Sequence, residues 1–278
     1  MPQVGPQATS QPCVWQAQEA IKAGRIGKVT WAQGGYNRND KSWGSLDAEP
    51  FLIDPEAGPQ ATGDNFIDWD QWLGWKFGLA PNIPFNPWHF FRFRKFWAYS
   101  GGLATDLLFH KLAPLLLAIV GPDGEYPSRV SAAGGLYAES NQDDGGQIPD
   151  TFMTTLDYPS GFSVFLETTV TNDTQIPARI YGKFGTIENF EEEPTLLANG
   201  EYAGEFLSAN NGYSEVRLGH KKGRDMEGNF IDVIRGNGKL FCNVELGAAT
   251  MVGIGLAVKA FRESKTLLWD RTNETELS

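Results

Sequence analysis

Between residues 129 and 190 the chain alternates apolar and polar side chains with a period of two, and this pattern constrains its fold more than any other feature. The alternating segments are residues 129–139, 151–158, 162–171, 178–182 and 186–190. Because successive side chains of a β-strand point to opposite faces, each segment is expected to be a strand with one buried face. The intervening sequences YPSGF and GKFG are short enough for hairpin turns, which join antiparallel strands.

Helical patterns flank this run of strands. They cover residues 14–25, 68–73, 101–119, 230–234 and 244–261, while residues 26–36 are typical of one further strand. Residues 191–224 are polar and weakly patterned and are expected to hold one hairpin, and the polar tail after Asp270 is expected to fray. Together these elements predict an α+β fold, with a large open, mostly antiparallel sheet and helices packed on one face.

The net charge of the chain limits the classes of ligand that it is expected to bind. The formal net charge is −11 and the sequence has no basic stripe, so nucleic acid and anionic membranes are unfavourable partners, whereas a neutral, sugar-like small molecule fits. No apolar run reaches the roughly 18 residues of a membrane span. The two cysteines, Cys13 and Cys242, cannot form a disulfide framework or a zinc site, and buried thiols are expected.

The motifs of several enzyme classes are missing from the sequence. The chain has no Walker A loop, no HExxH zinc motif and no GxSxG elbow, and its three histidines lack metal-ligand spacing. The sequence GIGLAV at Gly253–Val258 comes closest to a dinucleotide-binding loop, but it lies inside a helical pattern and is interpreted as helix packing. We therefore expect neither a metal nor a dinucleotide to be bound by this chain alone.

Residues 88–112 (WHFFRFRKFWAYSGGLATDLLFHKL) hold the strongest candidate site. Asp106 and His110 are four residues apart in an otherwise apolar helical segment, so a helix would place them on one face. A histidine is the natural general base near neutral pH, and a carboxylate one turn away can orient it. The alternative is a buried Asp–His pair that only completes the core.

Candidate substrate-binding residues surround this pair. Basic and aromatic side chains alternate just before the helix, and a long loop after the first strand adds polar ones. The candidates are His89, Arg92, Arg94, Lys95, Trp97, Tyr99, Asn37, Arg38 and Asn39. For each of them surface solvation or packing remains the alternative. The many aromatic residues between 66 and 99 could equally form a local core or the wall of a ligand pocket.

The order and spacing of short segments along nearly the whole chain resemble one protein family. The segments are Ala20–Val29, Arg94–Gly102 followed by Asp106 and His110, Pro149–Thr151, Tyr158–Gly161, Gly182–Ile187, Asn243–Gly247 and Trp269–Asp270. Each is weak alone, but together they resemble the C-terminal domain of the Gfo/Idh/MocA oxidoreductases. The resemblance implies that residues 1–278 form one such domain.

Family members combine this domain with an N-terminal Rossmann domain that binds NAD or NADP and ends near a catalytic lysine. Neither is found in this sequence, so the chain resembles a member truncated at its N-terminus. By the same resemblance, Asp106 and His110 match the family's Asp-x-x-x-His pair, in which the histidine helps to transfer the proton of the substrate hydroxyl.

The resemblance implies the substrate side of an NAD(P)-dependent sugar or cyclitol oxidoreductase that is not redox-active alone. The partners it implies are a sugar-like molecule, a separate Rossmann domain and a second copy bound through the open sheet face. A cytoplasmic location is expected. Two alternatives stay open: a non-enzymatic oligomerisation or sugar-binding module, and a cofactor-independent keto-sugar lyase or isomerase that uses Asp106 and His110 as acid and base.

Overall fold

A ten-stranded sheet forms the framework of the protein, for which a computed structural model describes residues 2–39, 53–138, 145–219 and 221–277. The strand order is β10-β9-β2-β3-β4-β1-β5-β6-β7-β8. The strands are β1 (Val29–Gly35), β2 (Arg129–Gly135), β3 (Thr151–Tyr158), β4 (Phe162–Thr169), β5 (Arg179–Gly182), β6 (Gly185–Glu188), β7 (Thr195–Ala198), β8 (Glu215–Arg217), β9 (Leu267–Asp270) and β10 (Thr275–Leu277).

Antiparallel pairing dominates this sheet, as the sequence pattern predicts. The two hairpin sequences join β3 to β4 and β5 to β6, and Tyr158 pairs with Phe162 across the first turn. The exception is β1, which lies between β4 and β5, parallel to the former and antiparallel to the latter. A strand from the start of the chain therefore sits at the centre of the sheet.

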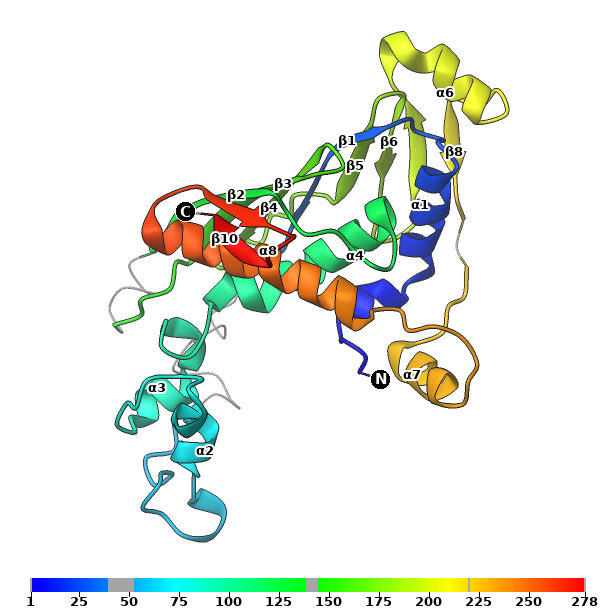
Figure 1. Ribbon diagram of the computed structural model, residues 1–278. Coiled ribbons are helices and arrows are strands. Elements are labelled where there is room, and N and C mark those ends of the chain that lie inside the picture. Colours follow the sequence, from blue (N-terminus) through cyan, green and yellow to red (C-terminus); the bar gives the residue numbers. More distant parts are fainter. Residues whose placement is uncertain (1, 40–52, 139–144, 220, 278) are drawn as a thin grey trace.

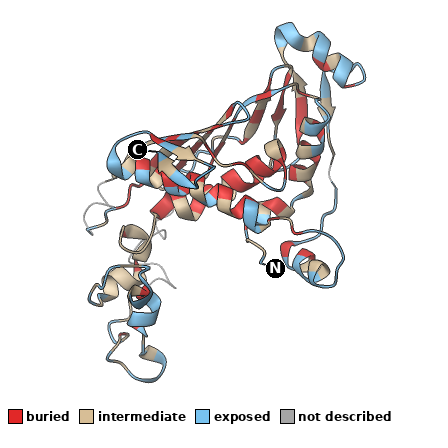
Figure 2. Cartoon of the chain, in the orientation of Figure 1, coloured by how far each residue is buried: buried red, intermediate tan, exposed pale blue. Residues whose placement is uncertain are grey.

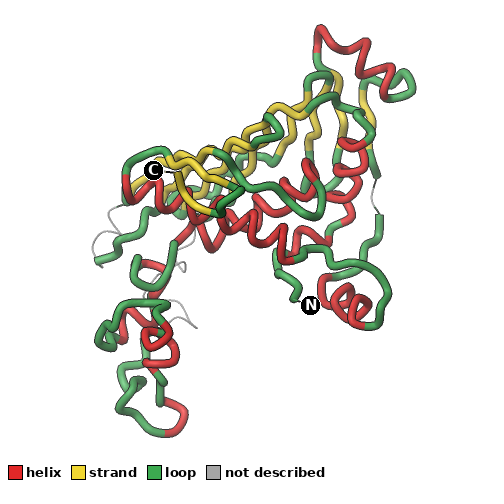
Figure 3. Tube along the Cα trace, viewed as in Figure 1, coloured by secondary structure: helices red, strands yellow, loops and turns green. Residues whose placement is uncertain are grey.

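Three helices cover one face of the sheet, which confirms the predicted α+β class. These helices are α1 (Pro12–Lys22), α4 (Phe109–Val120) and α8 (Val244–Glu263), and Figures 1 and 3 show them on the same side of the strands. The side chains of β3 alternate between buried and half-buried along its length, as expected for a strand with one covered face. Leu112 and Leu116 of α4 and Leu156 of β3 are completely buried between the two layers.

Residues 53–100 form a separate projection, which we call the arm. It contains α2 (Trp69–Leu73) and α3 (Pro87–Phe91) and extends away from the sheet (Figure 1). Buried residues concentrate between the sheet and its helices, whereas most of the arm is half-buried or exposed (Figure 2). The arm nevertheless has a small core of its own, in which Trp69 stacks on Trp72 with ring centroids 4.9 Å apart.

Two expectations for weakly patterned segments need correction. Residues 191–224 hold β7, a short helix α6 (Ala203–Ala209) and β8, so the two strands pair but a helix rather than a tight turn connects them. The C-terminal tail forms β10 on the sheet edge instead of fraying. The Asp270 carboxylate accepts hydrogen bonds from the backbone N–H of Thr272 and from the Asn273 side chain, which closes the turn that returns the chain to the sheet.

The remaining helices agree with the sequence patterns, with one qualification. A helix α7 (Met226–Ile234) includes the predicted segment 230–234. The expectation that no apolar run reaches the length of a membrane span needs correction, because among the described residues α8 is long and apolar enough to cross a membrane by length and composition. Just over half of its apolar window (56%) is buried within the protein.

The interpretation of the glycines in α8 as packing residues is confirmed for Gly253 but not for Gly255, where a Cβ would meet nothing within 4 Å. A side chain at Gly253 would come within 2.8 Å of Leu156 and 3.4 Å of Leu112, so this glycine lets α8 approach the sheet and α4 closely. The two cysteines are also buried thiols, as predicted. Burial raises the pKa of Cys13 and raises that of Cys242 to about 12, so both remain protonated and unreactive near neutral pH.

The arm enters the helix layer through Gly102, whose backbone makes a sharp turn. Its φ of +65° lies in the left-handed region, and a Cβ at this position would overlap the side chain of Ile148. Both properties require glycine. The helical segment that follows begins as a π-helix at Ala104–Leu108 and continues as α4.

Replacing Gly102 with alanine is expected to lower the free energy of unfolding by about 2 kcal/mol or more, because the variant combines a strained φ with a steric overlap. Gly255, inside α8, is the matched control, since a Cβ there meets nothing within 4 Å. The Gly255→Ala variant should gain about 0.5–1 kcal/mol from helix propensity. Urea unfolding followed by circular dichroism measures both, and equal stabilities would contradict the account of Gly102.

Candidate functional site

His110 lines an open hollow of about 410 Å³ on the helix side of the protein. The hollow forms where the start of α4 meets the end of β1, the N-terminus of α1 and the loop after β6. Its lining residues are Gln7, Ala8, Gln11, Tyr36, His110, Lys111 and Glu191. This volume falls within the range of small-molecule sites, and most of the lining side chains can form hydrogen bonds.

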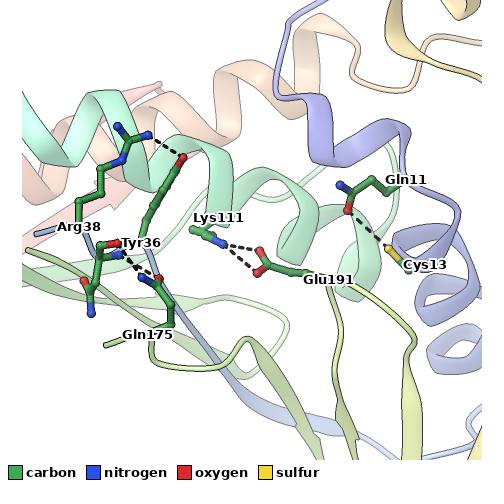
Figure 4. Close-up of polar contacts among 8 residues, drawn as sticks. Gln11, Cys13, Tyr36, Arg38, Lys111, Gln175 and Glu191 are labelled. Carbon is green, nitrogen blue, oxygen red and sulfur yellow. Dashed lines mark hydrogen bonds and ion pairs between the residues drawn. The ribbon is translucent and has the colours of Figure 1, made fainter. Parts of the chain in front are cut away.

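An ion pair occupies one wall of the hollow. The Lys111 amine lies 2.6 Å from one carboxylate oxygen of Glu191 and 2.8 Å from the other, so it donates to both (Figure 4). The same amine lies 5.2 Å from the centre of the Tyr36 ring. Lys111 is thus held by a carboxylate and an aromatic face, and its side chain is only 16% exposed.

Tyr36 connects this wall to the loop that follows β1. The Arg38 guanidinium donates a hydrogen bond of 2.9 Å to the Tyr36 hydroxyl, and its central carbon lies 5.0 Å from the centre of the ring. Figure 4 shows Tyr36 between Arg38 and Lys111. Arg38 therefore supports a residue of the hollow without lining it.

Asn37 was predicted as a substrate contact, but its side chain forms hydrogen bonds within the fold instead. Its side-chain amide donates to Glu167 at 2.6 Å and to the Thr174 carbonyl at 2.7 Å, while its oxygen accepts from the Thr169 N–H at 3.0 Å. These bonds attach the loop after β1 to β4. Burial raises the pKa of the Glu167 carboxyl, and the hydrogen bond from Asn37 partly opposes this rise. The neighbouring candidate Asn39 is exposed.

Asp106 and His110 do not form the expected hydrogen-bonded pair in the described part of the chain. Asp106 instead forms an ion pair with Arg94, whose Nε lies 3.2 Å from its carboxylate. The physical reason is the π-helix at Ala104–Leu108, because its wider turn breaks the spacing that places residues four apart above one another. Asp106 and His110 are also both half-buried rather than enclosed in the core.

The remaining candidates lie in the arm. His89 Nδ1 is 3.2 Å from the Tyr99 hydroxyl, and the His89 ring stacks on Phe96 with centroids 3.9 Å apart. Burial lowers the pKa of His89 and raises that of Tyr99, so a neutral hydrogen-bonded pair is favoured at neutral pH.

The candidates Arg92, Lys95 and Trp97 make contacts within the arm and between the arm and the body. Arg92 is buried and donates to the Phe91 carbonyl at 3.1 Å. The carbonyl of Lys95 accepts from the N–H of Gln147 at 2.8 Å. The Trp97 ring lies under the guanidinium of Arg262 in α8, 5.0 Å from centroid to carbon.

The structure thus places most of the predicted site residues away from the lining of the hollow. His110 lies in the hollow, whereas none of the arm candidates is among the residues that line it in the described part of the chain. Five polar lining residues were not predicted from the sequence: Gln7, Gln11, Tyr36, Lys111 and Glu191. Lys111 could have been found, since it directly follows His110, but Glu191 reaches the hollow only through the fold.

Metal or dinucleotide binding has no support among the described residues. No group of three or more His, Cys, Asp or Glu side chains there is placed to hold a metal ion. Gly253 and Gly255 lie inside α8, where their backbone groups belong to the helix rather than to a phosphate-binding loop. These two glycines therefore do not form a dinucleotide-binding loop.

Solved structures with the same fold are known, although no family model and no curated protein matches the sequence. A NAD-binding protein from Listeria innocua is 15% identical, with a TM-score of 0.57 over 96% of this chain and 66% of that one. An aldose-aldose oxidoreductase from Caulobacter crescentus, complexed with glycerol, is 14% identical, with a TM-score of 0.60 over 96% and 63% of the two chains. The chain has the fold of part of these oxidoreductases.

A third structure extends the comparison. It is an oxidoreductase from Agrobacterium radiobacter in complex with NAD+, L-tartaric acid and magnesium, 12% identical, with a TM-score of 0.56 over 96% of this chain and 64% of that one. The chain therefore spans less than two thirds of the length of each of these neighbours. At such low identity the similarity establishes the fold alone.

The structural role of Asn37 leads to a test. Replacing it with alanine is expected to lower the free energy of unfolding by about 2–3 kcal/mol, because a buried N–H of Thr169 and the Glu167 carboxylate lose their partner. The exposed Asn39→Ala variant should change it by less than about 0.5 kcal/mol. Chemical unfolding measures both free energies. If the Asn37 variant were as stable as the parent protein, Asn37 would again be a candidate ligand contact.

Proposed function

We propose that this chain is the substrate-binding part of an NAD(P)-dependent oxidoreductase of the Gfo/Idh/MocA family, acting on a hydroxyl of a sugar or cyclitol. The observation that carries the proposal is the position of His110 in a polar hollow, on a fold shared over 96% of the chain with NAD-binding oxidoreductases. Nothing in the described part provides the cofactor, so the chain alone is not proposed to be redox-active.

The lining of the hollow favours a neutral ligand with several hydroxyl groups. Gln7, Gln11 and Tyr36 offer uncharged donors and acceptors, and Lys111 and Glu191 neutralise each other. A polyol satisfies such groups through its hydroxyls, each of which both donates and accepts. Glycerol, itself a polyol, is bound in the structure of the Caulobacter crescentus neighbour, which supports this choice of ligand class.

His110 is proposed to exchange a proton with a ligand hydroxyl. No hydrogen bond engages its ring in the described part of the chain, so both nitrogens are available to a molecule in the hollow. Asp106 contributes in a different way from that expected, because its ion pair with Arg94 attaches the arm next to the helix that carries His110. Any influence of the arm candidates on the ligand is proposed to act through this attachment.

NAD or NADP is proposed to be held by a Rossmann domain outside this chain, either in a preceding segment or in a separate polypeptide. The limited share of each neighbour that the chain spans, 63–66%, supports this division. We propose that the protein acts in the cytoplasm.

A sugar-binding module without redox chemistry is the second candidate function. The lack of a dinucleotide cradle in the described residues favours it, since binding in the hollow needs only the lining side chains. The third candidate, a cofactor-independent lyase or isomerase, loses support because Asp106 pairs with Arg94 and is not among the described residues that line the hollow with His110.

Replacing His110 with alanine tests the proposed site. We expect the affinity of the full chain for D-glucitol, measured by titration calorimetry, to fall about tenfold, since hydrogen bonds to the ligand are lost. The His89→Ala variant, which alters the arm but not the hollow, should bind like the parent protein. If the His110 variant bound D-glucitol as tightly as the parent protein, the proposed site would be wrong. If the chain alone bound NADH tightly, the proposal that a Rossmann domain outside this chain holds the cofactor would be wrong.

The open sheet face is proposed to bind a second copy of the chain. Trp31 on this face is 39% exposed and stacks on Tyr181 with ring centroids 3.9 Å apart, and Leu268 and Leu277 are exposed at the β9–β10 edge. Helices α1, α4 and α8 lie on the opposite side, so they leave these apolar side chains uncovered (Figure 1). Exposed apolar patches of this kind commonly mark interfaces.

Light scattering coupled to gel filtration tests this association. We expect the parent protein to be at least dimeric and the Trp31→Asp variant to shift towards the monomer, because a charge on the face must lose its hydration in the interface. Phe77→Asp is the control, since Phe77 is also an exposed aromatic residue, 77% exposed against 39% for Trp31, but lies in the arm. A monomeric parent protein, or a Trp31 variant with the parent mass, would reject the proposal.

A further inference from the structure

The charges of the hollow are concentrated in one ion pair. Among the described residues that line it, Lys111 and Glu191 are the only side chains besides His110 that can carry a formal charge near neutral pH, and their charges are opposite. Gln7, Gln11 and Tyr36 bring hydrogen-bonding groups without a formal charge at neutral pH. Whether a charged ligand can bind therefore depends on how strongly Lys111 and Glu191 interact with each other.

The geometry of the ion pair leaves Lys111 with little uncompensated charge. Both carboxylate oxygens of Glu191 accept from the amine, at 2.6 and 2.8 Å, and the Tyr36 ring lies 5.2 Å away. The Lys111 side chain is more deeply buried than that of Glu191, with exposures of 16% and 34%. The Glu191 carboxylate is thus the more exposed partner of the pair.

We infer that Glu191 determines the specificity of the hollow: by neutralising Lys111, it admits neutral polyhydroxyl ligands and rejects their carboxylate analogues. This inference rests on the proposed function only in assigning a polyol to the hollow. Glu191 makes no contact with the imidazole in the described structure, so its role is selection of the ligand and not proton transfer.

The physical reason is a difference between two bound states. A ligand carboxylate in the hollow faces the Glu191 carboxylate, and like charges at short range repel each other. To bind Lys111 it must also displace a partner that already makes two charge-assisted hydrogen bonds. A hydroxyl carries no charge, so it can hydrogen-bond to the outer side of Glu191 without separating the pair.

Removing the charge of Glu191 reverses this preference. In a Glu191→Gln variant the amide oxygen still accepts one hydrogen bond, but Lys111 becomes a largely buried cation without a counter-charge. Such a cation favours an anionic ligand. Arg38 does not substitute for Lys111, because its guanidinium is engaged with Tyr36 and it is not among the lining residues.

The test compares two probes that differ in one group, D-glucitol and D-gluconate, by titration calorimetry with the full chain. The parent protein should bind glucitol more tightly than gluconate. In Glu191→Gln the ratio of gluconate to glucitol affinity should rise about tenfold, the effect of one charge-assisted hydrogen bond. In the double variant Lys111→Gln/Glu191→Gln the rise should disappear, because no cation remains to attract the carboxylate.

Each outcome has a distinct meaning. An unchanged affinity ratio in a folded Glu191→Gln variant, or a rise that persists in the double variant, overturns the role of the ion pair. A parent protein that binds no glucitol, together with a gain of gluconate binding that depends on Lys111, overturns the proposed polyol ligand but supports charge selection by Glu191. Thermal unfolding of all variants separates these results from loss of the fold.

Discussion

The packing of α4 between the sheet and its neighbouring helices is the constraint on which the rest of the molecule depends. The side chains of Leu112, Leu115 and Leu116 are at most 1% exposed to solvent. They belong to one hydrophobic core with residues of the sheet and of α1 and α8. Their burial sets the rotation of the helix about its axis. That rotation in turn presents the preceding residues, His110 and Lys111, to the hollow at the end of the layer.

The same constraint explains why local strand patterns were a good guide to the sheet. A strand buried on one face must alternate, so the segments that became β2 to β6 could be located from their side chains alone. The position of β1 could not be found in this way, since nothing in its own sequence states that it will lie between β4 and β5. The return of the tail as β10 was missed for a similar reason, because its polar residues gain their order from Asp270 and from a neighbouring strand.

For the candidate site, the sequence identified the helix but not its surroundings. His110 was found because histidine is chemically informative, and a spacing of four residues suggested Asp106 as its partner. The π-helix changed that pairing, and such a departure from regular geometry leaves no clear mark in the composition of Ala104–Leu108. Glu191 and Gln11 reach the hollow from distant parts of the chain, so only the three-dimensional arrangement shows that they face His110.

The central position of β1 also has a consequence for how the chain acquires its structure. The β3–β4 hairpin can form from neighbouring residues, but β1 pairs with β4 through contacts such as Trp31 with Ser163, which lie far apart along the chain. Contacts of this kind require a long loop to close before they stabilise anything, which slows folding. Without β1, β4 and β5 would present unpaired strand edges of the kind that favour aggregation, so this one long-range pairing protects both halves of the sheet.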